Sequence, residues 1–244
     1  MEVEFAMANA GTKRTHEATR RRAAHAPVAN KASRGAAIAR DEVGGARAKR
    51  GAARRKAILA AALEEFSTRG FEAARLDDVA RRAGIAKGTI YLYFSDKETL
   101  FQELVRSEIS PIIGTLEHVT QVEAPIRMIA EKFVELFVRE IIETRRKDII
   151  RLILSEGPRF PKLAEFYYRE VIARALNAVR AVLRRAVERG ELANDMLARF
   201  PQLLVAPALV AIVWNALFER FEPLDTRAML RAHFEFIFGA GRAV

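Results

Sequence analysis

The sequence predicts an all-α protein. From residue 54 onward, apolar residues recur at three- and four-residue steps, which places them on one face of successive helices. No segment alternates apolar and polar side chains convincingly enough to form a strand. Proline and glycine separate the periodic segments, and both residues end helices. We therefore expect a series of helices joined by turns.

Composition limits the class of protein. Half of the 244 residues are apolar and 30% are charged, which is typical of a globular chain of one or two domains. The net charge of +10 attracts polyanions, either nucleic acid or an anionic membrane. There is no cysteine, which excludes disulfides, thiolate metal sites and a thiol nucleophile. With no secretory signal, these features favour a cytoplasmic protein.

Residues 1–50 are predicted to form a disordered basic tail, because they contain few large apolar side chains and show no sustained helical or strand periodicity. They carry eleven Lys and Arg against five acidic residues. Such a tail could bind DNA phosphates without sequence preference. A solvated leader, natural or from cloning, is an alternative interpretation, and so is an organellar transit peptide.

Four helices are predicted next. The first begins at about Arg54, and Gly70 ends it in the usual C-terminal role. The second covers residues 77–83 and the third covers residues 87–94. Ser95–Glu98 matches a capping box, with serine at the cap and glutamate three residues later, so the fourth helix should begin there.

The second and third helices have the pattern of a helix-turn-helix. Gly84 allows the positive φ that a sharp turn needs, so one helix can brace while the next projects. Ile90 and Phe94 are four residues apart and supply a face that docks on the other helices. Lys87 and Tyr91 are also four apart and would face outward, toward base edges and phosphates.

Several short segments stand at a spacing known from one family of regulators. They follow a first helix that ends in phenylalanine, and they are Gly70-Phe71, Asp78-Val79-Ala80, Ala83-Gly84-Ile85, Lys87-Gly88-Thr89-Ile90-Tyr91, Tyr93-Phe94 and Lys97-Glu98. With these segments, the stretch from Arg54 to Arg106 resembles the DNA-binding domain of the tetracycline-repressor (TetR/AcrR) family. The resemblance implies a helix-turn-helix domain over residues 51–106 and a helical ligand-binding and dimerisation domain over residues 107–244.

The resemblance also implies the DNA contacts. Bases or their methyl groups would be contacted by Lys87, Gly88 and Tyr91. Phosphates would be bound by Thr89, Tyr93 and Lys97, and Leu92 would contact DNA more weakly. The family usually has hydroxyl residues where this chain has Ala74-Arg75 and Ala86, although Arg75 could bind a phosphate instead. The alternative is a helical core element in which the two tyrosines simply pack.

The rest of the chain is also predicted to be helical. The approximate helices are 125–143, 147–155, 161–190, 195–219 and 225–238. The segment Glu156–Pro161, followed by Phe166-Tyr167-Tyr168, resembles the C-terminal domains of some AcrR-type members, which dimerise and enclose a small ligand. The candidate pocket residues are Met128, Phe133, Phe137, Phe166, Tyr167 and Trp214, although residues at helical spacing more often form plain core than a pocket wall. His118 and His233 have no partners at metal-ligand spacing, so no metal site is predicted.

Residues 200–218 contain no charged side chain and are the predicted dimer surface, together with the helix at 225–238. That second helix offers Met229, Leu230, Phe234, Ile237 and Phe238. Paired across a two-fold axis, the two helices would form a four-helix bundle. The rival is a membrane span, against which Pro201, Pro207, Gln202 and Asn215 argue.

The hypothesis is a ligand-responsive, sequence-specific DNA-binding regulator. A homodimer would repress from a palindromic operator and be released by a small apolar effector, without a cofactor or a membrane. Activation in place of repression stays open. An enzyme with a DNA-binding head is not favoured, since the sequence has no nucleophile elbow, phosphate-binding glycine loop or metal-spaced His/Glu set. The third class is a nucleoid-type or membrane-associated protein that uses the basic tail without sequence preference.

Overall fold

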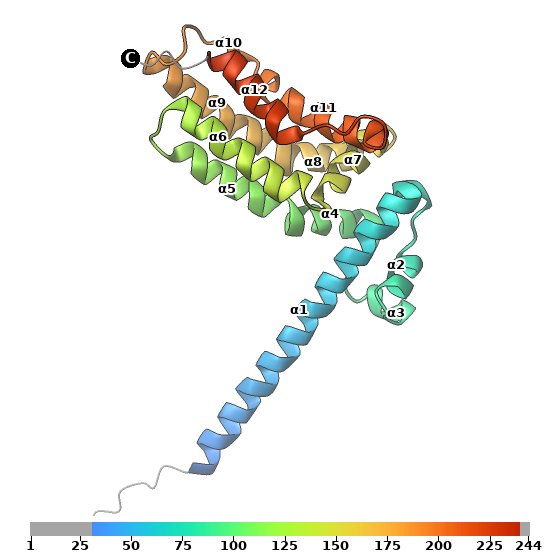
Figure 1. Ribbon diagram of the computed structural model, residues 1–244. Coiled ribbons are helices and arrows are strands. Elements are labelled where there is room, and N and C mark those ends of the chain that lie inside the picture. Colours follow the sequence, from blue (N-terminus) through green and yellow to red (C-terminus); the bar gives the residue numbers. More distant parts are fainter. Residues whose placement is uncertain (1–30, 240–244) are drawn as a thin grey trace, which may run out of the picture. The chain divides into compact units, whose positions relative to one another are not determined.

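The computed structural model describes the backbone of residues 31–239 and the side chains of residues 49–239. Every regular element in these ranges is helical, so the all-α prediction is confirmed. Figure 1 labels the helices in chain order. Their bounds are α1 (Lys31–Ala73), α2 (Leu76–Arg82), α3 (Lys87–Ile90), α4 (Lys97–Glu108), α5 (Ser110–Gln121), α6 (Ile126–Phe137), η1 (Val138–Ile142), α7 (Arg146–Glu156), α8 (Pro161–Tyr167), η2 (Tyr168–Ile172), α9 (Ala173–Glu188), α10 (Met196–Arg199), α11 (Gln202–Phe218) and α12 (Thr226–Phe238); η1 and η2 are π-helical.

The start of α1 differs from the prediction. We expected the helix to begin at about Arg54 and the preceding residues to lack regular structure, whereas α1 begins at Lys31. Residues 31–50 are rich in alanine and arginine, which have high intrinsic helix propensity even where no apolar stripe is present. The part of the predicted tail before residue 31 lies outside the described residues.

The chain divides into two units, residues 1–48 and residues 49–244, and the features described below belong to the second. No boundary separates the predicted DNA-binding and ligand-binding domains in this division. One buried cluster runs from Ile58 of α1 to Ile212 of α11 and so includes side chains from both. The division at residue 106 therefore stays a prediction.

The start of α4 corrects the predicted capping box. Asp96, rather than Ser95, is the N-cap, and its Oδ1 accepts a hydrogen bond of 2.6 Å from the backbone N–H of Thr99. Ser95 instead donates from its hydroxyl to the other carboxylate oxygen of Asp96, over 3.0 Å. An ionised carboxylate is a stronger acceptor than a hydroxyl and gains from the helix dipole, so it takes the cap. The bond from Thr99 lowers the pKa of the Asp96 carboxyl.

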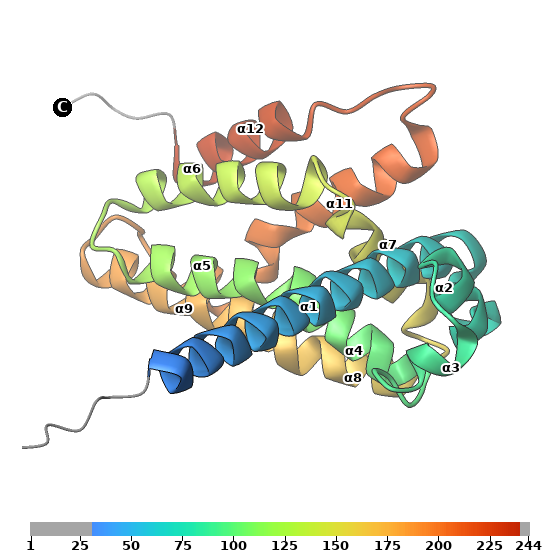
Figure 2. The ribbon, with the colours of Figure 1, turned by 90° about the horizontal axis from the view of Figure 1, so that it is seen from below.

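The C-terminal helices agree with the predicted segments and subdivide three of them. Segment 125–143 contains α6 and η1, segment 161–190 contains α8, η2 and α9, and segment 195–219 contains α10 and α11. The break between α10 and α11 falls at Phe200, which leaves the helical region (φ −122°, ψ 64°) because Pro201 follows it. Figure 2 shows α5 lying along α9 and α12 lying along α6.

Not all of α12 is available for the predicted dimer surface. Leu230 and Phe234 are buried in a second apolar cluster of the same chain, and Ile237 and Phe238 pack against it. Periodicity marks the apolar face of a helix, but it does not show whether the covering surface belongs to the same chain or to a partner. Within the described residues, no helix has the length and hydropathy needed to cross a bilayer.

An aromatic cluster joins the first and fourth helices to the segment before α8. Phe71 is fully buried, and its ring centroid lies 5.4 Å from that of Phe66, 6.0 Å from Phe101 and 5.1 Å from Phe160. Ion pairs between Glu64 and Arg145 and between Glu72 and Arg159 flank this joint. Exposed ion pairs add little to the free energy of unfolding, so the packed rings contribute most of the stability of this joint.

Replacing Phe71 by alanine should therefore lower the free energy of unfolding by about 3–5 kcal/mol, the usual cost of removing a buried phenylalanine. Urea unfolding followed by circular dichroism measures this loss. Leu92→Ala is the control, because Leu92 is 83% exposed and its loss should change stability by less than about 0.5 kcal/mol. Equal stabilities of the two variants would contradict this view of the joint.

Candidate nucleic-acid interface and apolar cavity

The turn between α2 and α3 is a Schellman motif. The backbone N–H of Ile85 donates to the carbonyl of Ala80 over 3.0 Å, and that of Gly84 donates to Arg81 over 3.2 Å. Gly84 has φ +67°, a left-handed conformation that glycine adopts without strain. The motif ends α2 within one residue, so α3 leaves in a new direction.

The third helix is shorter than predicted. Regular α-helix covers Lys87–Ile90 in place of residues 87–94, and hydrogen-bonded turns continue it. The amides of Tyr93 and Phe94 both donate to the carbonyl of Ile90, each over 2.9 Å. Ile90 and Phe94 are buried, as their docking role requires. Residues 87–94 together are called the recognition segment below.

The outward face of the recognition segment is open. The Lys87 side chain is 71% exposed, Tyr91 is 49% exposed and Leu92 is 83% exposed. A Cβ added at Gly88 would meet no atom within 4 Å. These three side chains are therefore accessible to solvent, and the backbone at Gly88 is not crowded by its neighbours.

A carboxylate of α2 contacts both of the principal predicted base contacts. The Asp77 Oδ2 lies 2.6 Å from the Lys87 Nζ, and its Oδ1 accepts a hydrogen bond of 3.3 Å from the Tyr91 hydroxyl. The bond to Lys87 is the main reason that the pKa of Asp77 is lowered and that of Lys87 is raised. The sequence did not predict these contacts, because spacing alone does not reveal how α2 and α3 cross.

The remaining predicted DNA contacts lie on the same part of the molecule. Arg75 is exposed at the N-cap of α2, while Thr89 and Tyr93 are half-buried. Neither α2 nor α3 has a side-chain cap, which agrees with the missing hydroxyl residues at Arg75 and Ala86. As DNA contacts, all of these residues remain predictions.

Lys97 has a second role that sequence reasoning missed. Its Nζ donates to the carbonyls of Phe71 and Glu72, over 2.9 and 2.8 Å, and lies 4.8 Å from the centre of the Phe71 ring. It thereby caps the C-terminal end of α1. Two of the three ammonium protons are occupied, which leaves one for a phosphate oxygen.

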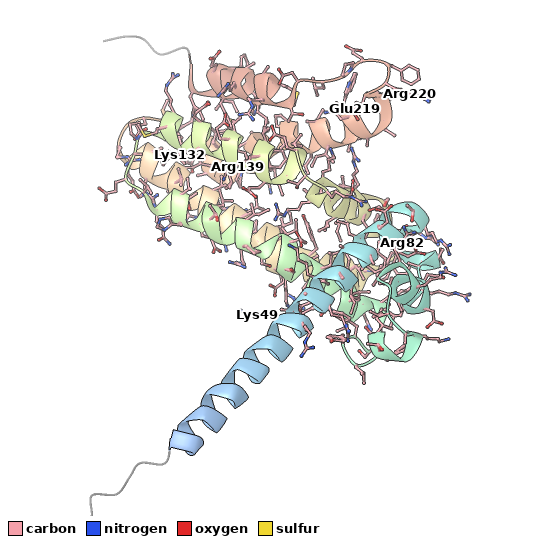
Figure 3. All side chains as sticks on the ribbon, turned by 60° about the horizontal axis from the view of Figure 1, so that its bottom comes forward. Lys49, Arg82, Lys132, Arg139, Glu219 and Arg220 are labelled. Atoms are coloured by element: carbon pink, nitrogen blue, oxygen red, sulfur yellow. The ribbon has the colours of Figure 1, made fainter. Side chains whose placement is uncertain are left out.

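A buried carboxylate braces α1 against α2. Glu65 is only 1% exposed and pairs with Arg82 over 3.1 Å and with Arg69 over 3.0 Å. Arg82 lies where α1 and α2 meet (Figure 3). Removing either partner of a buried charge is costly, so these contacts hold the brace of the helix-turn-helix in place.

An apolar cavity of about 40 Å³ lies in the second cluster, between α5, α6, α9, α11 and α12. Its lining residues are Leu116, Val119, Thr120, Ile126, Ile129, Ala130, Phe133, Val179, Val182, Leu183, Leu204, Val205, Phe234 and Phe238. Thr120 is the single polar residue among them. By volume, the cavity has room for only a few water molecules.

Of the six predicted pocket residues, the structure brings only Phe133 to this cavity. Met128 is 54% exposed, and Phe166 and Tyr167 are buried in the other cluster, where burial raises the pKa of the Tyr167 hydroxyl. Phe137 packs between the two clusters, and the Trp214 indole donates to the carbonyl of Glu222 over 2.8 Å. Helical periodicity identified apolar faces, but a core and a cavity wall share the same pattern.

Two family models match the chain. Residues 58–104 match the model of bacterial regulatory proteins of the tetR family, and residues 130–233 match the model of tetracyclin repressor-like C-terminal domains. Together they cover more than half of the sequence and both parts of the fold. The chain belongs to the tetR family.

Individual relatives agree with this membership. The HTH-type transcriptional regulator RutR of Escherichia coli K12 is 30% identical over 131 residues, which are 54% of this chain and 54% of RutR. The chain thus spans about half the length of that curated relative. The HTH-type transcriptional regulator AcrR of Shigella flexneri is 25% identical over 169 residues, covering 67% of this chain and 78% of AcrR.

Solved structures share the fold. The transcriptional regulator FadR from Bacillus subtilis, in complex with stearoyl-CoA, superposes with a TM-score of 0.62. It is 19% identical, and the superposition covers 75% of this chain and 97% of FadR. At this identity the likeness concerns the fold alone.

Proposed function

We propose that the chain is a ligand-responsive, sequence-specific DNA-binding regulator, a repressor that a small apolar molecule releases from a palindromic operator. The observation that carries this proposal is the recognition segment, which is docked through Ile90 and Phe94 and leaves Lys87 and Tyr91 exposed. Membership of the tetR family, whose relatives include transcriptional regulators, supports it.

The contacts with DNA fall into two groups. Lys87, Gly88 and Tyr91 meet base edges in the major groove, and Leu92 touches them more weakly. The phosphates are bound by Arg75, Thr89, Tyr93 and the one free proton of Lys97. Base contacts supply the sequence preference, while phosphate contacts position the protein.

Operator binding requires a dimer, because one short helix reads too few base pairs. The exposed side of α11 offers the surface. Exposed apolar residues recur on it at alternating three- and four-residue steps, which is the spacing of a helix that packs along another helix. They are Leu203, Ala206, Val210, Val213 and Leu217. Charge returns only at Glu219 and Arg220, at the end of α11 (Figure 3). Two copies of α11, with the outer residues of α12, form the interface.

The effector binds at the apolar cavity. The lining offers apolar contacts almost throughout, which suits a hydrocarbon chain or ring. FadR, which shares the fold, was solved with stearoyl-CoA, a molecule with a long apolar chain. Ligand sites usually enclose about 300–1,000 Å³, so an effector must move the surrounding helices apart. This displacement couples effector binding to the spacing of the two recognition segments.

A DNA duplex selected from a random library by the full chain should contain two half-sites about 34–36 Å apart, because each protomer presents one recognition segment. Tyr91→Ala should weaken binding to that operator by roughly tenfold to a hundredfold, as expected for a lost base contact. Fluorescence anisotropy at fixed salt measures both affinities. Tyr168→Ala is the control, since Tyr168 is also exposed but lies in η2. Failure to enrich any sequence, or equal binding by both variants, would contradict the proposal.

Val210→Asp should convert the dimer into a monomer, because the two-fold interface would bury an unpaired carboxylate from each copy. Sedimentation velocity of the full chain measures the change. Val122→Asp makes the same substitution at an exposed valine after α5 and should leave the dimer intact. The proposed interface is wrong if the unaltered chain sediments as a monomer or if both variants remain dimeric.

Stearoyl-CoA and 1-dodecanol, each of which has a long apolar chain, serve as probes of the effector site. At least one should lower the affinity for the selected operator by about five- to hundredfold. Ala130→Leu narrows the cavity and should abolish this response while operator binding persists; Ala181→Leu, on the exposed side of α9, should respond normally. An unchanged response in Ala130→Leu would rule out this cavity, and no response to either probe would count against an apolar effector.

A further inference from the structure

Asp77 and Asp78 are neighbours in the first turn of α2 but have different partners. Asp78 pairs with Arg69 over 3.2 Å and with Arg81, both outside the recognition segment. Asp77 contacts Lys87 and Tyr91, the two exposed residues of that segment that stand four apart. Arg75 is the other cation that acts on the Asp77 carboxylate.

Stability of the fold does not account for the Asp77 contacts. The Lys87 side chain is 71% exposed, and an ion pair this open to water contributes little to folding. The contacts do two other things. They hold the side chains of Lys87 and Tyr91 toward Asp77, and they place a negative charge beside the only lysine of the recognition segment.

We propose that Asp77 is a specificity-determining positioning residue, which holds Lys87 and Tyr91 ready for bases and suppresses binding to DNA of the wrong sequence. The inference rests on the proposed function, since it assigns the recognition segment to the major groove. Neither the family models nor the resemblance of the recognition segment assigns this role to Asp77.

The mechanism is an exchange of partners. Any duplex that draws Lys87 away must replace the 2.6 Å contact with Asp77. A phosphate offers a single charge contact and leaves Asp77 close to the negatively charged backbone, so the exchange gains little on arbitrary DNA. A guanine edge offers two acceptors to the lysine, while the tyrosine ring contacts a neighbouring base, so the exchange is favourable on the operator. The carboxylate thus penalises non-specific complexes more than the specific one.

Asp77→Asn tests this assignment, with Asp78→Asn as the matched control. Both variants remove one negative charge from adjacent positions of the same helical turn, so their bulk charge effects are alike. The full chain is titrated with the selected operator and with a scrambled duplex of equal length and composition, at several salt concentrations. Circular dichroism and thermal unfolding establish that both variants are folded.

Asp77→Asn should lower the ratio of operator to scrambled affinity by about tenfold, mainly by strengthening binding to scrambled DNA. Once Lys87 is freed from Asp77, it can bind a further phosphate and release counterions from the DNA. The slope of log affinity against log salt concentration, measured on scrambled DNA, should therefore become more negative by about one. Asp78→Asn should leave the ratio within about twofold of the unaltered chain, since its partners are not on the recognition segment.

Lys87→Met separates a positioning role from a merely structural one. If Asp77 acts through Lys87, adding Asp77→Asn to Lys87→Met should have little further effect on scrambled DNA. Equal changes in the two asparagine variants, or an unchanged ratio in Asp77→Asn, would overturn the proposal. So would weaker operator binding with unaltered scrambled binding, because Asp77 would then contact the operator itself. If the unaltered chain prefers no sequence, the proposed function fails instead.

Discussion

The burial of Ile90 and Phe94 is the interaction on which the recognition segment depends. Only one turn of regular helix covers Lys87–Ile90, and such a short helix is not stable by itself in water. Ile90 is fully buried and Phe94 nearly so, in the same cluster as α1, α2 and α4. Tertiary packing therefore holds the segment in a helical conformation and frees its opposite face for Lys87 and Tyr91.

The same principle extends through the rest of the second unit. The Phe71 rings and Lys97 tie the end of α1 to α4, and Glu65 ties α1 to Arg82 of α2. One apolar cluster continues from these helices to α11, and Phe137 packs between it and the second cluster, which holds the cavity. Packed side chains thus connect the cavity to the recognition segment. If the cavity binds the effector as proposed, its coupling to DNA runs through these packed side chains and needs no flexible linker.

Local sequence signals predicted most of the helices but placed several ends wrongly. Gly84 acts through its own backbone chemistry, so its turn was predicted from the sequence. The break before Pro201 was missed, because residues 195–219 were predicted as one helix. The extension of α1 to Lys31 was missed, since an apolar stripe was the criterion and helix propensity was not weighed. The cap at Asp96 was missed because two adjacent residues could each fill it, and their competition depends on local geometry.

The sequence alone determined the helical class, the helix-turn-helix and the outward position of Lys87 and Tyr91, because helical periodicity sets which side chains share a face. Only the tertiary structure decided which faces meet. It joined Asp77 to both of these residues and turned Leu230 and Phe234 inward. It also brought Phe133 alone, of the predicted pocket residues, to the cavity. Those outcomes depend on how helices cross, which is set by the packing of side chains far apart along the chain.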